Sequence, residues 1–159
     1  MASRKSFKGL MMSTTNHRQE ISTDSGRDID TETVGKIFMV HDENLPDIEG
    51  LDTETGMHNS GGMGDLYLEL LATFVVDYAD FGRNFARHVS DGEWDDARRL
   101  AHTLKGVASM LGIASLRTSA ESLEVVCKLK CAETALQQLE VVTVELSSML
   151  AALQRFFAN

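Results

Sequence analysis

The sequence predicts an all-α protein, an antiparallel up-down four-helix bundle with a short extra helix on its N-terminal side. Three observations support this class. Leucine, alanine and methionine are plentiful, whereas aromatic residues make up only 6% of the chain. Apolar residues recur at spacings of three and four through the last two thirds of the sequence, as in helices that pack along their length. The connections between these stretches are short, and we find no internal repeat and no pair of strands.

Residues 1–45 differ in composition from the rest of the chain. They are polar and rich in Ser, Thr, Asp and Arg, and only residues 37–40 could bury apolar surface. We expect residues 1–45 to form a flexible tail or linker, and residues 46–159 to form the bundle. Pro46 and Gly50 mark the boundary, residues 51–56 predict a short helical turn, and residues 59–62 a loop.

Four longer helices follow. The first is expected to run unbroken from about Gly64 to Ser90, and the second to end at Gly112. Ser115 is the expected N-cap of the third, and a turn at residues 130–132 leads into the fourth. The predicted core stripes are, in chain order, Tyr67, Leu71, Phe74, Tyr78, Phe81 and Phe85; Leu100, Leu104, Val107 and Leu111 with Ala97, Ala101 and Ala108; Ile113, Leu116, Ala120, Leu123 and Cys127; and Leu136, Leu139, Leu146, Leu150, Leu153 and Phe157, with Thr143 in the one polar slot.

Charge and composition exclude several classes of function. A net charge of −9 with no basic stripe argues against nucleic-acid binding. Two cysteines make no disulfide framework, and no apolar run approaches the ~18 residues of a membrane span. The start of the chain lacks the apolar segment of a signal peptide. We therefore expect a cytoplasmic protein that does not insert into a membrane.

The polar face of the second long helix carries an unusual group of residues. His102, Lys105, Gly106 and Ser109 lie opposite the core stripe, and Asp95, Arg98 and Arg99 precede them by one or two turns. Imidazole is a good neutral nucleophile near pH 7, so an exposed histidine can accept a phosphoryl group on a ring nitrogen. Glycine inside a helix costs roughly 1 kcal/mol relative to alanine. Folding alone therefore does not account for this face.

Each neighbour of the histidine has a candidate role. Lys105, at i+3, could pair with phosphate oxygens. Gly106, at i+4, would let a partner's backbone approach, and Ser109, at i+7, could hydrogen-bond the imidazole or the phosphate. Arg98 and Arg99 favour a partner with an acidic pocket. The bland alternative is an ordinary surface histidine, with Gly106 placed where two helices come close.

The segment Ala101-His102-Thr103-Leu104-Lys105-Gly106, with Leu111-Gly112 and the later Leu116, Ala120, Leu123 and Glu124, closely resembles the signature of histidine-containing phosphotransfer (HPt) domains of bacterial phosphorelays. Asp65–Leu71 with Phe74 resembles the first long helix of that family, and Leu51-Asp52 its usual entry. The resemblance covers about residues 48–157. The sequence departs from the family pattern at Val107, Ser109 and Met110, which leaves open the group that hydrogen-bonds the imidazole.

The resemblance implies that His102 takes phosphate from the aspartate of one receiver domain and passes it to another, with Lys105 supporting the phosphate and Gly106 keeping access open. The implied partners are receiver domains of response regulators or a hybrid sensor histidine kinase, and Mg²⁺ is expected from the receiver, with no cofactor bound by this chain. We expect a monomeric phosphocarrier. The alternative is a docking or regulatory module that carries no phosphate. A kinase is not expected, because no nucleotide loop is present.

Other reactive residues have weaker interpretations. Cys127 and Cys131 are one turn apart but lack further ligands for a tetrahedral metal site, so buried, inert thiols are expected. His88 fits a cation at a helix C-terminus. Trp94 is expected to pack at the start of its helix, and His17, His41 and His58 to lie in tail or loop. No metal site is predicted.

Overall fold

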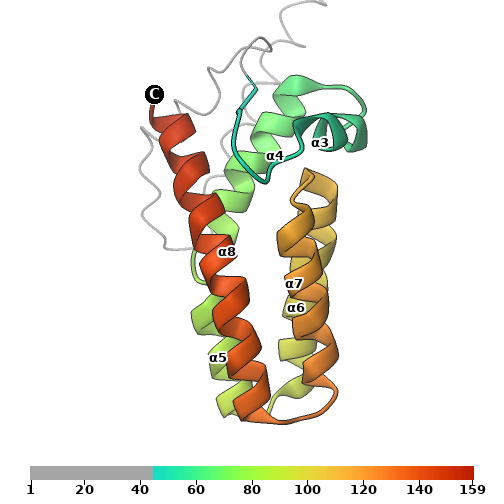
Figure 1. Cartoon of the computed structure of the whole chain (residues 1–159), viewed down its shortest axis with the longest axis vertical. Coiled ribbons are helices and arrows are strands. Elements are labelled where there is room, and N and C mark those ends of the chain that lie inside the picture. The colour runs from blue at the N-terminus through green and yellow to red at the C-terminus, as the bar shows by residue number, and fades with distance from the viewer. Residues whose placement is uncertain (1–44) are drawn as a thin grey trace, which may run out of the picture. The chain divides into compact units, whose positions relative to one another are not determined.

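The computed structural model describes residues 45–159. The predicted tail, with His17, His41 and the apolar run 37–40, lies outside these residues. The described part consists of six helices and contains no strand (Figure 1). The helices are α3 (Thr53–Asn59), α4 (Gly64–Asp77), α5 (Phe81–Ser90), α6 (Trp94–Leu111), α7 (Ala114–Cys127) and α8 (Ala132–Ala158). The all-α prediction is therefore confirmed for this part of the chain.

The expected single helix over residues 64–90 is divided into α4 and α5. The α4 helix ends at Asp77, and its C-cap is Tyr78, whose amide donates to the Phe74 carbonyl over 3.2 Å; Phe81 begins α5. The aspartates at 77 and 80 flank the break, and aspartate has a low helix propensity. The aromatic stripe survives the break, because the rings of Tyr78 and Phe81 lie 6.2 Å apart. The periodicity was thus correct for burial and wrong for helix continuity.

The core-facing stripe of α6 is narrower than predicted. Leu104 and Leu111 are fully buried together with three alanines, whereas Leu100 and Val107 lie at its edge and are only partly buried. Gly112 ends the helix in the left-handed conformation, at φ 83°. A Cβ atom there would lie 2.1 Å from the Asp52 carbonyl oxygen, so this turn requires glycine for its space as well as its backbone angle.

The α3 helix lies against the C-terminal end of α6. The Tyr67 hydroxyl donates to the Leu111 carbonyl over 2.9 Å, and the Asn59 amide donates to the carbonyls of Ser109 and Met110 over 3.3 and 3.1 Å. The last carbonyls of a helix lack intrahelical partners, and these bonds supply them. Side chains from two other segments therefore cap the helix that carries His102.

The beginning of α7 and the buried stripe of α8 differ from the prediction in detail. Ile113 is the N-cap of α7 and makes no side-chain cap bond, so Ser115 lies inside the helix. In α8 the buried position predicted for Thr143 belongs to Val142, and Leu136 is 39% exposed. Thr143 instead faces α5, since a Cβ atom at Gly82 would lie 3.3 Å from its Oγ1.

Among the described helices, α8 alone is long and apolar enough to cross a membrane by length and composition. The sequence did not predict this, because no apolar run in it reaches that length. It contains Glu140, Glu145 and Arg155, and seven of its residues are buried. The α8 helix packs on α4, α5 and α7. Only 22% of its most apolar stretch is buried, so the buried stripe accounts for part of its apolar character.

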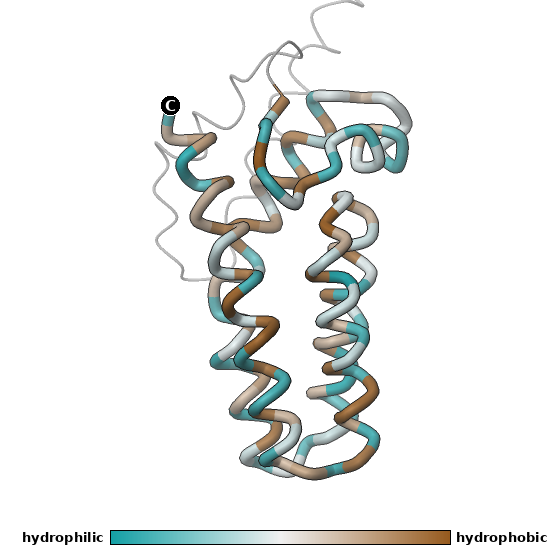
Figure 2. Tube along the Cα trace, in the orientation of Figure 1, coloured by the Kyte–Doolittle hydropathy of each residue, from teal (hydrophilic) through white to brown (hydrophobic). Residues whose placement is uncertain are grey.

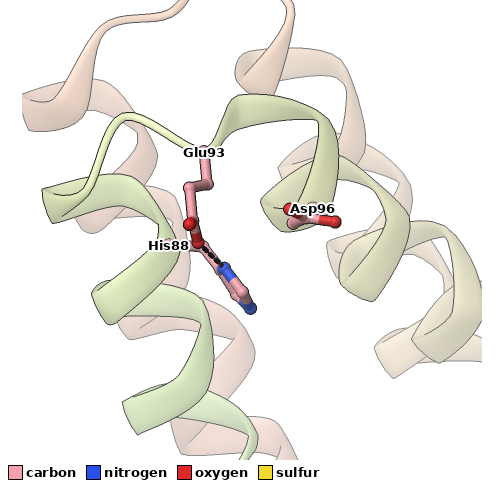
Figure 3. Close-up of side chains that lie close together, drawn as sticks. All are labelled: His88, Glu93 and Asp96. Carbon is pink, nitrogen blue, oxygen red and sulfur yellow. Dashed lines mark hydrogen bonds and ion pairs between the residues drawn. The ribbon is translucent and has the colours of Figure 1, made fainter.

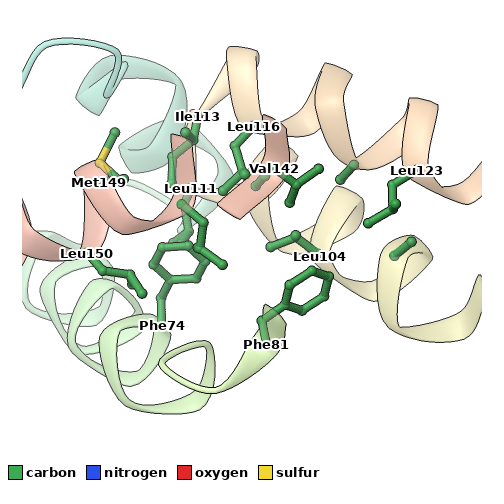
Figure 4. Close-up of a cluster of buried hydrophobic side chains, with 14 of the residues drawn as sticks. Phe74, Phe81, Leu104, Leu111, Ile113, Leu116, Leu123, Val142, Met149 and Leu150 are labelled. Carbon is green, nitrogen blue, oxygen red and sulfur yellow. The ribbon is translucent and has the colours of Figure 1, made fainter. Parts of the chain in front are cut away.

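One hydrophobic core joins these helices. Its side chains come from α4, α5, α6, α7 and α8 and include Phe74, Phe81, Leu104, Leu116, Leu123, Val142 and Leu150 (Figure 4). Burial of each such side chain contributes roughly 1.5–3 kcal/mol. The longest shared boundary is between α6 and α7. Hydrophilic and hydrophobic residues are interspersed along the helices (Figure 2). On α6, Arg98, Arg99 and His102 are exposed and leave a polar face at the surface.

Candidate functional site

His102 projects from the polar face of α6, eight residues after the helix begins. Its side chain is 65% exposed. Its Nδ1 atom lies 3.0 Å from Oε1 of Glu124, which belongs to α7. The structure thus joins the exposed imidazole to a carboxylate on the neighbouring helix, a partner to which the sequence had assigned no role.

Glu124 binds two groups at once. Its second oxygen, Oε2, lies 2.7 Å from the Lys105 ammonium. The Glu124 side chain is only 17% exposed and that of Lys105 25%. The hydrogen bond from Lys105, followed by a smaller one from His102, lowers the pKa of Glu124, against the opposing effect of desolvation. Glu124 is therefore ionised at neutral pH.

The ionised carboxylate fixes the tautomer of His102. A carboxylate can only accept hydrogen bonds, so the hydrogen of a neutral imidazole must be on Nδ1. Nε2 then carries the free lone pair. Within the described part of the chain no hydrogen bond reaches Nε2. The arrangement therefore presents Nε2 as an exposed nucleophile and holds the ring from behind.

The contact between α6 and α7 sets this geometry. Small residues on the buried face of α6, Ala101 and Ala108, and Ala120 on α7 are completely buried and leave room for close packing. Glu124 follows the buried Leu123 and so lies at the edge of the α7 stripe. Since the side chain of a residue beside the buried stripe extends along the helix boundary, Glu124 can reach the polar face of α6.

Gly106 lies in open space. A Cβ atom built at this position would meet nothing within 4 Å. The bland explanation, that Gly106 is needed where helices come close, is therefore wrong. Because Gly106 has no side chain, the surface one helical turn from His102 is unobstructed.

Ser109 does not approach the imidazole. Seven helical residues correspond to a rise of about 10.5 Å, so Ser109 shares the face of His102 but lies two turns away along the axis. Its side chain makes no hydrogen bond to any described residue, and its carbonyl accepts a bond from Asn59. The imidazole instead donates from Nδ1 to Glu124, and the alternative role of Ser109, a hydrogen bond to the phosphate, stays a prediction.

The predicted docking residues surround the histidine. Asp95, Arg98 and Arg99 line a shallow depression of about 390 Å³ together with His102 and Glu124. Arg99 forms an ion pair with Asp96. A larger groove of about 720 Å³ lies between residues 47–50 and α8 and contains none of the predicted site residues.

The two cysteines, Trp94 and His58 differ in their burial and in their agreement with the predictions. Cys127 is buried, and desolvation raises the pKa of its thiol to about 11, as expected for an inert cysteine. Cys131 is exposed, and a hydrogen bond from Thr134 lowers its pKa, so the prediction of burial is wrong there. Trp94 packs at the start of α6 as predicted. His58 lies in the last turn of α3, not in a loop.

Comparison with known proteins adds one finding. The family model described as Hpt domain matches residues 69–156, which is more than half of the chain. The match includes the helix of His102 and the helix of Glu124. No curated protein and no solved structure matches the chain.

Proposed function

Because the chain belongs to the Hpt domain family, we propose that it relays a phosphoryl group between receiver-domain aspartates through a phosphohistidine at His102. The observation that carries this proposal is the bond between Nδ1 of His102 and Glu124, which leaves Nε2 exposed and free. Members of this family take part in phosphorelays as phosphocarriers and not as kinases.

In the proposed reaction, Nε2 attacks the phosphorus of a receiver's aspartyl phosphate in line with the leaving oxygen. The nitrogen–phosphorus bond forms as the phosphorus–oxygen bond breaks, and the aspartate carboxylate leaves with its electron pair. The hydrogen on Nδ1 stays in its bond to Glu124. The ring gains positive charge, which the Glu124 carboxylate stabilises. The return step to a second receiver reverses these changes.

Lys105 has two possible acceptors in this scheme. In the structure its ammonium contacts Glu124. A phosphoryl group on Nε2 brings new anionic oxygens to the same face, one helical turn away. We propose that Lys105 turns toward them while Glu124 keeps the imidazole.

The surface around His102 suits a receiver. Gly106 lets the partner's backbone approach, and Arg98 and Arg99 provide positive charge opposite an acidic pocket. We propose that Mg²⁺ comes with the receiver, whose acidic residues would hold it, and that Asp95 helps to set the docking orientation. Under this proposal the partners are response regulators or a hybrid sensor histidine kinase of a bacterial cytoplasm.

The arrangement of the helices belongs to the same proposal. We propose that α4 with α5, α6, α7 and α8 form the four arms of an antiparallel up-down bundle, with α3 as the extra N-terminal helix. The pairings of α5 with α6, α6 with α7, α7 with α8, and α8 with both α4 and α5 support this topology. The chain is then a monomer that presents one face of α6.

A transfer assay tests the proposal. A receiver phosphorylated by acetyl phosphate is mixed with the full chain, and the label on the chain is measured. We expect an acid-labile, base-stable label that His102→Gln abolishes, and that His58→Gln, a change at an exposed histidine of α3, leaves intact. Incubation with ATP alone should give no label. Labelling that persists in His102→Gln would contradict the assignment, and receiver binding without any label would favour a docking module.

A further inference from the structure

A second cluster of reactive side chains lies at the turn between α5 and α6. His88, Glu93 and Asp96 each place one ligand atom within 4.8 Å of the others (Figure 3). The His88 side chain is 17% exposed, whereas Glu93 and Asp96 are more open, at 48% and 39%. We infer that these three residues bind a divalent transition-metal ion of the Zn²⁺ type.

The backbone of the turn brings the three residues together. The amide of Glu93 donates to the His88 carbonyl over 2.8 Å, and Gly92 takes a left-handed conformation at φ 73°. His88 is in the last turn of α5, Glu93 is the N-cap of α6, and Asp96 is in its first turn. The ligands are therefore held by two helix ends and a short connection.

Glu93 is not used to cap its own helix. Although it occupies the N-cap position of α6, it makes no side-chain bond to the helix amides. Its carboxylate instead lies 2.5 Å from Nδ1 of His88 (Figure 3). The Glu93 carboxylate therefore faces the partly buried His88 imidazole, and a bound ion would take the place of the hydrogen bond between them.

The donor set selects the class of ion. One imidazole nitrogen and two carboxylate oxygens suit Zn²⁺ and its neighbours, with bonds of about 2.0–2.2 Å and water in the remaining position. Mg²⁺ and Ca²⁺ prefer sets made only of oxygen, and more of them. Tetrahedral bonds of this length place donor atoms about 3.4 Å apart. Side-chain rotation of the two exposed carboxylates covers the difference from the observed spacing.

Within the turn itself the charges favour a cation, although Arg87, Arg98 and Arg99 flank it. Residues 91–96 contain four acidic side chains and no lysine or arginine. Among residues 45–159, the cation that pairs with one of these ligands is Arg99, which binds Asp96 at the surface. Exposed ion pairs of this kind are weak, so a divalent ion can displace the guanidinium.

The site is separate from His102. Asp96 precedes His102 by six residues of α6, about 9 Å along the helix axis. A metal ion there would bridge the end of α5 to the start of α6. Because it would bind the folded chain and not the unfolded one, it would raise the unfolding temperature.

The test uses the full chain after treatment with EDTA. We titrate it with ZnCl₂ by calorimetry and follow thermal unfolding, and Co²⁺ absorption reports the ligand geometry. We expect one saturable equivalent and a higher unfolding temperature. Glu93→Gln and Asp96→Asn should each weaken this phase roughly tenfold or more, since loss of a ligand should cost at least as much as loss of an outer-shell partner. Asp95→Asn and His58→Gln are the matched controls and should retain it.

The two carboxylate variants keep the test decisive if His88→Gln fails to fold, because Glu93 is exposed and Asp96 is only partly buried. A wild-type chain without a saturable zinc phase would overturn the inference. So would a phase that survives unchanged in both Glu93→Gln and Asp96→Asn. Equal binding of MgCl₂ would overturn the assigned class of ion.

Discussion

Removal of the Glu124 carboxylate should slow phosphoryl transfer at His102 more than it weakens the fold. The carboxylate accepts the Nδ1 hydrogen over 3.0 Å, and its importance grows as the ring becomes positive during transfer. Hydrogen bonds to charged groups contribute about 1.5–3 kcal/mol, which corresponds to roughly 10- to 100-fold in rate if the bond matters mainly in the transition state. The ion pair with Lys105 is near the surface, so its loss should cost only about 0–1 kcal/mol of stability.

Two substitutions separate the contributions of Glu124. Glu124→Ala removes both contacts and should give the full rate loss. In Glu124→Gln the amide oxygen can still accept from Nδ1, but the amide nitrogen cannot accept from Lys105, and the neutral group stabilises the charged ring less well. We expect an intermediate rate. Single-turnover transfer from a phosphorylated receiver, measured by rapid quench, gives the rates, and urea unfolding gives the stabilities.

Glu121 provides the control. It is exposed on the same helix and makes no hydrogen bond or ion pair with any described residue. Glu121→Ala removes the same charge from α7 without touching the imidazole, and it should transfer at the wild-type rate. If Glu124→Ala folds normally and transfers as fast as the wild type, the role assigned to the bond is wrong. Equal losses in the two variants would indicate a general effect of charge on docking.

Three further outcomes follow from the same geometry. Gly106→Ala should stabilise the fold by about 1 kcal/mol in urea unfolding, because the helix gains propensity and the new Cβ meets nothing, yet it should slow transfer from a receiver. Gly112→Ala should lower the unfolding temperature strongly, since its Cβ would clash with the Asp52 carbonyl. The bond from Lys105 lowers the pKa of Glu124, so it stabilises the fold above the pKa of an unfolded glutamate and is lost as pH falls through the folded value. Carboxyl NMR can follow this loss, and a Glu124 that titrates at the ordinary pKa of a glutamate would contradict it.

The helices were predictable because apolar residues that recur at spacings of three and four mark the buried side of a helix. The stripe from Tyr67 to Phe85 was predicted correctly as core except at Tyr78, which is only partly buried, and Gly112 was predicted correctly as a helix end. The break at residues 78–80 was missed, because aromatic residues keep the same spacing across it. Periodicity describes which side of a segment is buried, and it does not require that one helix carry the whole stripe.

The sequence predicted the site residues that lie on the same helix as His102, and it did not predict the one that comes from another helix. Lys105 and Gly106 follow from helical spacing, since residues at i+3 and i+4 are neighbours. Ser109 lies on the same face but too far from His102 along the helix axis, and the position of a residue around the helix does not give that axial distance. Glu124 comes from another helix, and its position depends on the register between α6 and α7. That register is set by the packing of small buried residues of both helices, and it cannot be predicted from a single sequence.

Under the proposed phosphorelay, Glu124 would allow one site to serve transfer in both directions. Before transfer, the negative carboxylate faces the positive Lys105 ammonium and a neutral imidazole. After transfer, the ring is positive beside Glu124, and the phosphoryl oxygens are negative within one helical turn of Lys105. Each charge that forms therefore meets an opposite charge already present in the site. Under the proposed phosphorelay, neither state leaves an uncompensated charge at the partly covered boundary of α6 and α7.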